Sequence, residues 1–167
     1  MSTEDAIEIQ PYDAATDLAA VRACFVELQD HEHALDPGAP TGEAIADDYV
    51  AWIFERCNRY EGRILVARAG GDVLGFLSVL LAVPRTDPDD PVPVHALIQD
   101  LVVSERWRSR GVGLHLIRTA EELAQAAGRP EIRVSVVAQN HGARRFYARE
   151  GYEEQLIYLG KSLDGNG

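Results

Sequence analysis

The segment 106–113 combines the residue types that hold a phosphate group. Its three arginines occupy alternate positions, and Gly111 and Gly113 follow at the expected start of a helix. A helix N-terminus carries about half a positive charge and unpaired N–H groups, so arginines beside it are favoured only if an anion lies between them. Glycine lets the backbone N–H groups approach a ligand closely. The segment therefore predicts a cradle for a phosphate or pyrophosphate.

Two common phosphate-binding loops do not fit this segment. A Walker loop needs Gly-Lys followed by Ser or Thr, and the segment holds no lysine. A dinucleotide-binding loop needs a third glycine where Leu116 stands, and it needs an acid after the next strand, which the chain does not offer.

A second pattern lies between residues 140 and 152, where an asparagine opens an expected short helix. The pattern reads Asn140-His141-Gly142-Ala143, Arg145-Phe146-Tyr147 and Gly151-Tyr152. An asparagine at this position can cap the helix, and Gly151 can end it in the left-handed conformation.

Both patterns resemble motifs of the GNAT superfamily of N-acetyltransferases. The first resembles the family's acetyl-CoA signature, Arg/Gln-x-x-Gly-x-Gly/Ala, and it follows Asp100-Leu101-Val102-Val103. The second is similar to the family's late Asn-x-x-Ala, Tyr and Gly-Phe segment. The chain departs from the family pattern where Ser109 replaces a common glycine and Tyr152 replaces a common phenylalanine.

The resemblance implies that acetyl-CoA is the co-substrate and that no metal is needed. It implies a pyrophosphate held by the backbone of residues 108–113 and a pantetheine arm beside residues 101–103. One N–H group, at Val102 or Val103, would face the thioester oxygen. Asn140 would bind the pantetheine or only cap its helix. The implied acetyl-CoA-binding residues are Leu101, Val102, Val103, Arg108, Ser109, Arg110, Gly111, Val112, Gly113, Asn140, Ala143 and Tyr147.

Tyr147 is also the candidate general acid. Its phenol, with an ordinary pKa of about 10, can give a proton to the leaving thiolate, whose thiol has a pKa of about 8.5. Packing into the core is the alternative role for this side chain.

The attacking amine must first lose a proton. With a pKa of about 10.4, only about one amine in 2,500 is neutral at pH 7. The candidate bases are Asp100 and Glu32, with His33 and His95 as alternatives. His31 and His33 are spaced too unfavourably to indicate a metal site.

The charge of the chain is uneven. The net charge is -11, and residues 1–60 hold thirteen acidic residues against three arginines. This balance argues against a nucleic-acid partner, which needs a basic surface. It favours a small cationic amine as acceptor, drawn by Asp30, Glu32, Asp36, Glu43, Asp47 and Asp48. Acidic helices that serve only solubility would give the same composition.

The elements that must position these residues follow from periodicity and turn signals. Helices are expected over 16–31, 41–58, 112–127 and 140–150, and strands over 6–10, 63–69, 73–83, 94–103, 132–137 and 154–162. Gly70-Gly71 predicts a tight hairpin. The fold expected is α/β (α+β), with a central, mixed, mostly antiparallel sheet flanked by about four helices, as in GNAT proteins.

We expect a single cytoplasmic domain over residues 1–167, with residues 164–167 frayed. The two cysteines lie outside any CxxC motif, no apolar run is long enough to span a membrane, and a signal-peptide core is absent. A homodimer is left open. The main hypothesis is acetyl transfer to a small cationic amine. The alternatives are a protein or peptide N-acetyltransferase and a non-catalytic acyl-CoA sensor or interaction domain.

Overall fold

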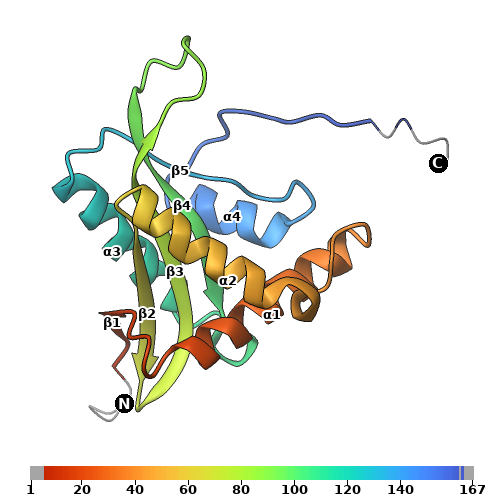
Figure 1. The fold of residues 1–167 in the computed structure, drawn as a ribbon, viewed down its shortest axis with the longest axis vertical. Helices are drawn as coiled ribbons and strands as arrows, with labels where there is room; N and C mark the ends of the chain where they lie inside the picture. The colour runs from red at the N-terminus through yellow and green to blue at the C-terminus, as the bar shows by residue number, and fades with distance from the viewer. Residues whose placement is uncertain (1–5, 162, 164–167) are drawn as a thin grey trace.

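The computed structural model describes residues 6–161 and 163, and Figure 1 shows how the elements are arranged. The helices and strands in chain order are β1 (Glu8–Pro11), α1 (Leu18–Leu35), α2 (Gly42–Arg59), β2 (Arg63–Ala69), β3 (Asp72–Pro84), β4 (Val94–Val103), the 3₁₀ helix η2 (Glu105–Trp107), α3 (Val112–Ala126), β5 (Ile132–Val134) and α4 (His141–Arg149).

The described strands form one sheet in the order β1-β2-β3-β4-β5. Neighbouring strands are antiparallel except β4 and β5, which are parallel. Helices α1 and α2 cover one face, while α3 covers the other with Tyr147 of α4 beside it. The predicted mixed, mostly antiparallel sheet with four helices is confirmed.

Strand β2 is buried on both faces, which explains why apolar and polar residues do not alternate along it. Ile64 and Val66 pack toward α1 and α2, whereas Leu65 and Ala67 pack toward α3. A strand covered on both faces buries every side chain, so it reads as a continuous apolar run. The hairpin that follows turns at Gly70 and Gly71, both with positive φ, as predicted.

Strand β4 contains a β-bulge at Gln99. Ser78 of β3 pairs with Asp100, and the next residue of β3, Val79, pairs with Ile98, so Gln99 is the extra residue. Ile98 packs in the cluster under α3, whereas Val102 packs with α1 and α2. The bulge therefore turns the second half of β4 over and directs Asp100 to the α1 and α2 face.

Three expected elements differ most from those in the structure. Helix α1 begins at Leu18 and continues to Leu35, because the residues after position 31 remain helical until the loop that contains Pro37. Strand β5 ends at Val134, where its pairing with Ile98 of β4 stops although β4 continues to Val103. No strand forms in the described part of 154–162, which extends without a pairing partner; Ser162 and the expected frayed tail at 164–167 lie outside the described residues. Across the described chain, the helices are too short or too polar to cross a membrane.

Candidate active site

The two parallel strands separate part-way along their length. Strand β5 pairs with β4 only from Ala96 to Ile98, while β4 continues to Val103. The last part of β4 therefore has an edge that no described strand covers. An edge of this kind can bind an extended ligand through main-chain hydrogen bonds, as an added strand would.

The direction of the main chain along this edge can be read from one hydrogen bond. The Ser104 N–H donates to the Leu74 carbonyl oxygen of the neighbouring hairpin at 2.9 Å. Main-chain groups alternate along a strand, so those of Val102 also point to β3. The N–H groups of Leu101 and Val103 point to the open edge. Of the two residues expected to face a thioester oxygen, the geometry favours Val103.

A row of N–H donors lies where β4 gives way to α3. Within the described part of the chain, the N–H groups from Ser109 to Leu114 meet no acceptor. Two residues of this turn have positive φ, Ser109 at 60° and Gly111 at 83°. The turn curls the chain so that these donors lead directly into the N-terminus of α3, where the helix dipole favours an anion.

The arginines of this turn surround the donors. Arg108 donates from Nε to the Val103 carbonyl oxygen at 3.1 Å, and Arg110 stacks on the Trp107 ring at 5.0 Å. Neither arginine forms an ion pair with an acid in the part of the chain that the structure describes. Arg106 does pair, with Asp72 at 3.4 Å. Two uncompensated positive charges therefore remain beside the N–H donors, which fits a diphosphate.

Gly113 also has a packing role. A Cβ at this position would lie 3.2 Å from Cζ of Phe146 in α4. The glycine therefore lets α3 and α4 pack closely, in addition to the ligand approach expected from the sequence. At the start of α4, the Asn140 Oδ1 accepts the Ala143 N–H at 3.0 Å, so the capping role of Asn140 is present.

Tyr147 lies buried between two other aromatic rings. The ring centroids of Phe146 and Tyr152 are each 5.4 Å from its own. Its hydroxyl makes no hydrogen bond to another described residue. Burial and, to a smaller extent, the charge of Asp100 raise the pKa of Tyr147 above its usual value. The phenol is therefore protonated at neutral pH.

Asp100 is the centre of a buried polar cluster that the sequence did not predict as a whole. Its carboxylate accepts hydrogen bonds from Ser78 Oγ at 2.5 Å and from Tyr49 Oη at 3.0 Å. Burial raises the pKa of Asp100, although these hydrogen bonds oppose the shift. Arg56 Nε donates to Gln99 Oε1 at 2.6 Å and adds a positive charge near the cluster. Ser78 could have been noticed as the single polar residue in an apolar run.

The structure brings together two of the expected bases and separates the others. Burial raises the pKa of the half-buried Glu32, and Asp100 raises it further, so both carboxyls face the same region. His33 instead contacts the Ala39 carbonyl oxygen through Nδ1 at 2.6 Å. Burial and Arg133 lower the pKa of His95, which lies beside a different set of charges. Among the described residues, no His, Cys, Asp or Glu side chains gather into a group of three that could hold a metal.

A shallow hollow opens on α2 next to this cluster. It has a volume of about 380 Å³ and is lined by Ile45, Asp48, Tyr49 and Trp52. These positions recur every three or four residues, so they share one helix face. Tyr49 stacks on Phe25 at 4.2 Å and reaches Asp100 through its hydroxyl, which connects the hollow to the buried carboxyl.

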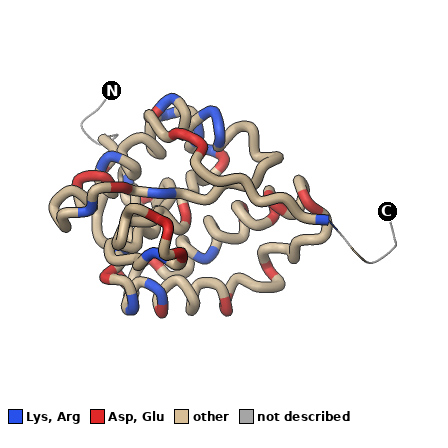
Figure 2. The backbone as a smooth tube through the Cα atoms, turned by 90° about the horizontal axis from the view of Figure 1, so that it is seen from above, with Lys and Arg blue, Asp and Glu red and all other residues tan. Residues whose placement is uncertain are grey.

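The six acids expected to draw cations differ in their surroundings. Four of them have hydrogen-bond or ion-pair partners in the structure. Arg22 binds Glu43 and Asp47 at 2.8 and 2.6 Å. Asp30 and Asp36 accept backbone N–H groups. Glu32 and Asp48 remain, and Figure 2 shows basic positions interspersed with acidic ones elsewhere.

Comparisons with known proteins agree with this geometry. A sequence model described as the Acetyltransferase (GNAT) family matches residues 25–152. An uncharacterized N-acetyltransferase of Methanocaldococcus jannaschii, MJ1207, is 28% identical over 67% of this chain and 47% of that protein. An aminoalkylphosphonate N-acetyltransferase of Salmonella typhimurium is 38% identical over 40% of this chain and 43% of that protein. The matches thus span less than half the length of these two relatives.

A solved structure shows the same fold. The GCN5-related N-acetyltransferase from Ralstonia eutropha superposes with a TM-score of 0.72 and 20% identity, over 96% of this chain and all of that one. The sheet that separates beside a row of free N–H donors thus belongs to an acyltransferase. The chain belongs to the GNAT family of acetyltransferases.

Proposed function

We propose that this protein transfers an acetyl group from acetyl-CoA to the nitrogen of a small cationic amine. The observation that carries the proposal is the row of free N–H groups from Ser109 to Leu114, which continues from the uncovered edge of β4. The free N–H groups suit the diphosphate of acetyl-CoA, and the uncovered edge of β4 suits the extended pantetheine arm that follows it. The N–H groups of Ser109 to Leu114 and the edge of β4 would hold acetyl-CoA without a metal ion.

The main chain would bind and orient the thioester. The N–H groups of residues 109–114 and the guanidinium groups of Arg108 and Arg110 would hold the diphosphate. The Leu101 and Val103 edge would pair with the pantetheine amides. In this position the Val103 N–H would donate to the thioester oxygen and stabilise the negative charge that develops on it.

The buried carboxyls would receive the proton of the amine. Removing that proton at pH 7 costs about 4.6 kcal/mol for an ordinary primary amine. Asp100 and Glu32 have raised pKa values, so each accepts a proton more readily than an exposed carboxylate does. The transfer could take place directly or through water.

Tyr147 of α4 would assist the departure of the thiolate. The phenol is protonated at neutral pH, and its hydroxyl has no competing acceptor among the described residues. It can therefore donate a hydrogen bond to the sulfur as the carbon–sulfur bond breaks, whereas its raised pKa makes complete proton transfer less favourable than from an exposed phenol.

The acceptor hollow favours a cation. Asp48 adds a carboxylate to the hollow, and Trp52 and Tyr49 line it with aromatic rings, of which Trp52 already has the Arg56 guanidinium 4.9 Å from its centroid. The Salmonella typhimurium relative is named for an amine that carries a phosphonate. A carboxylate at the hollow would repel such an anionic group, so we expect a different acceptor here. A cytoplasmic location stays a prediction.

Release of free thiol from acetyl-CoA tests the proposal. The acceptor panel contains a diamine, an aminoalkylphosphonate and a basic peptide. We expect the diamine to be the best acceptor. We expect Tyr147→Phe to lower kcat by about 10²-fold or more and to leave the KM for acetyl-CoA within about 2-fold. Tyr152→Phe, a change of the neighbouring ring, is the matched control and should keep most of the activity.

Each other outcome identifies an alternative. Release with the peptide alone indicates a protein or peptide acetyltransferase. Binding of acetyl-CoA without thiol release on any acceptor indicates a non-catalytic acyl-CoA domain. Equal losses of kcat and of acetyl-CoA affinity in Tyr147→Phe indicate a packing role for this side chain.

A further inference from the structure

The carboxyl of Asp100 is out of reach of an amine that binds in the α2 hollow. Asp100 is only 4% exposed, and the hollow is lined by other residues, all of them on α2. A proton donor must come within hydrogen-bond distance of the atom that takes its proton. A proton that leaves such an amine can therefore reach Asp100 only through a group that lies between them.

Tyr49 is the side chain that borders both the hollow and the buried carboxyl. Its ring lines the hollow, and its hydroxyl donates to Asp100 Oδ1 at 3.0 Å. The ring is held in place by stacking on Phe25, with centroids 4.2 Å apart and planes 15° apart. A phenol that donates its single proton still has a lone pair with which to accept a hydrogen bond. An ammonium group in the hollow can therefore donate to the Tyr49 oxygen.

Titratable and charged groups approach Asp100 from three helices. Glu32 of α1 has its pKa raised by burial and by the charge of Asp100, while Arg56 of α2 opposes the rise in the pKa of Asp100. Burial and the charge of Asp100 also raise the pKa values of the Cys57 thiol on α2 and the Tyr147 phenol on α4. The thiol and the phenol are protonated at neutral pH, so only the two carboxyls of this group can receive a proton.

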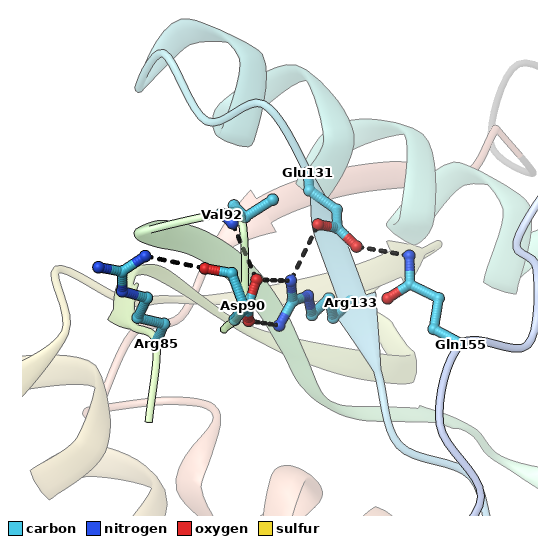
Figure 3. A network of polar contacts seen from close by, with 6 residues as sticks. All are labelled: Arg85, Asp90, Val92, Glu131, Arg133 and Gln155. Atoms are coloured by element: carbon cyan, nitrogen blue, oxygen red, sulfur yellow. Dashed lines mark hydrogen bonds and ion pairs between the residues drawn. The ribbon is translucent and has the colours of Figure 1, made fainter. Parts of the chain in front are cut away.

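A second network of charges in the chain has the opposite character. Figure 3 shows Arg133 of β5 between Asp90 and Glu131. Arg133 donates to Asp90 at 2.6 and 3.0 Å and to Glu131 at 3.0 Å. These hydrogen bonds lower the pKa of Asp90 to about 2 and also lower the pKa of Glu131. The network stabilises its carboxylates in the charged form, whereas burial prepares Asp100 to take up a proton.

We infer that the Tyr49 hydroxyl relays the proton of the acceptor amine to Asp100. The inference rests on the proposed function, because it concerns the amine that is acetylated. An N–H bond of the ammonium group breaks as its proton binds the Tyr49 oxygen, and the Tyr49 O–H bond breaks as that proton binds Asp100 Oδ1. The electron pair of the N–H bond stays on the nitrogen, which can then attack the thioester.

The relay returns Tyr49 to its starting state and leaves Asp100 as a neutral carboxylic acid. Both protons move together, so the phenol never becomes charged. This agrees with the burial of Tyr49 and its contact with Asp100, which raise the pKa of the phenol and disfavour a phenolate. After the product leaves, the reverse movement gives the proton to water and restores the carboxylate.

The pH dependence of acetyl transfer tests the relay. Tyr49→Phe keeps the ring that stacks on Phe25 and removes the hydroxyl. Thiol release with the diamine as acceptor gives kcat/KM at each pH. About one ordinary amine in 2,500 is neutral at pH 7, but about a quarter are neutral at pH 10 and need no relay. We expect the variant to be slower than the wild type by about 10-fold or more at pH 7, and by less than about 3-fold at pH 10.

Tyr12→Phe is the matched control. Tyr12 packs against the same cluster between the sheet and the first two helices as Tyr49 does, but its ring stacks on Phe54. Removing its hydroxyl should leave kcat/KM within about 2-fold of the wild type at every pH. Titration calorimetry with the diamine adds a readout besides activity. Tyr49→Phe should bind the diamine within about 3-fold of the wild-type Kd, because Asp48 and the aromatic rings remain.

A double variant identifies the group that receives the proton. Residues that act as one unit lose activity together, so Tyr49→Phe combined with Asp100→Asn should be within about 2-fold of Asp100→Asn alone. Losses that multiply would indicate Glu32 as the receiver and overturn the relay to Asp100. A Tyr49→Phe loss that is equal at every pH, or a loss of diamine binding, also overturns it. A wild type that acetylates no amine overturns the proposed function and the relay together.

Discussion

Replacing Gly111 with glutamate places a side chain and a negative charge among the N–H donors of the turn before α3. Gly111 has a φ of 83°, and the nearest atom to a Cβ there is 3.9 Å away, in His115. The substitution therefore meets no steric clash, and its cost to folding is the left-handed conformation, about 1–2 kcal/mol. Gly128, with a φ of 70° and open space around it, provides the matched control. Both glutamate variants should lose about 2–8 °C of Tm.

Ligand stabilisation separates the two variants. A ligand at 100 times its Kd stabilises a protein by about 2.7 kcal/mol. For a chain of this size that energy corresponds to a rise in Tm of about 5–11 °C. We expect acetyl-CoA to produce this rise in the wild type and in Gly128→Glu, and to produce none in Gly111→Glu, because the new carboxylate would occupy the donors and repel the diphosphate.

Thermal unfolding with and without acetyl-CoA is the assay. Coenzyme A without the acetyl group should give a similar rise, since the diphosphate is common to both. A wild type that shows no rise at millimolar ligand, or a Gly111→Glu variant that keeps the full rise, would refute the reasoning.

Two further substitutions test the packing and the charge of the site. Gly113→Val should cost about 1–3 kcal/mol of unfolding free energy, because its Cβ presses on Phe146, whereas Gly142→Val, at the same position of α4, should change it by less than about 0.5 kcal/mol; equal losses would contradict the packing role. The Tm of Asp100→Asn minus the Tm of the wild type should increase as pH rises from 4.5 to 8. The pKa of Asp100 is raised in the folded state, so the unfolded chain ionises first and wild-type stability falls with pH above about 4, while Asn stays neutral; a Tm difference that does not change with pH would contradict this.

The turn of free N–H groups before α3 could be predicted from the sequence because its determinants are local. Arg108, Gly111 and the start of α3 lie within a few residues of one another, and a helix N-terminus attracts anions wherever it lies. The bounds of β4 were predicted correctly for a similar reason, since a mostly apolar run of ten residues is typical of a central strand.

The buried cluster around Asp100 could not be predicted from the sequence. Tyr49 and Ser78 lie 51 and 22 residues away from Asp100, and only the packing of α2 on β3 and β4 brings them together. Which face Asp100 takes depends on the bulge at Gln99, and a bulge is defined by the register with the partner strand.

The last strand was wrongly expected because apolar character alone does not make a strand. Residues 156–159 have the composition of one, but a strand also needs a neighbour to satisfy its backbone groups. Within the described chain the segment pairs with no strand, although the outer edge of β5 is free, and it is extended and exposed. The ion pairs on α2 could not be predicted from the sequence either. Arg22 of α1 lies more than twenty residues from Glu43 and Asp47, and only the packing of the two helices brings them together.

The bulge at Gln99 gives β4 one residue more than its ladder with β3 needs. Ile98 pairs with Val79 and Asp100 pairs with Ser78, so the loss of Gln99 alone would leave a regular ladder with both side chains on their present faces. That loss would remove the amide oxygen that accepts a hydrogen bond from Arg56 at 2.6 Å. The loss of a single residue elsewhere in the second half of β4 would instead move the residues beyond it to the opposite face, because side chains alternate with a period of two. Over evolutionary time, Gln99 is therefore the position at which this half of β4 can lose one residue and keep its core.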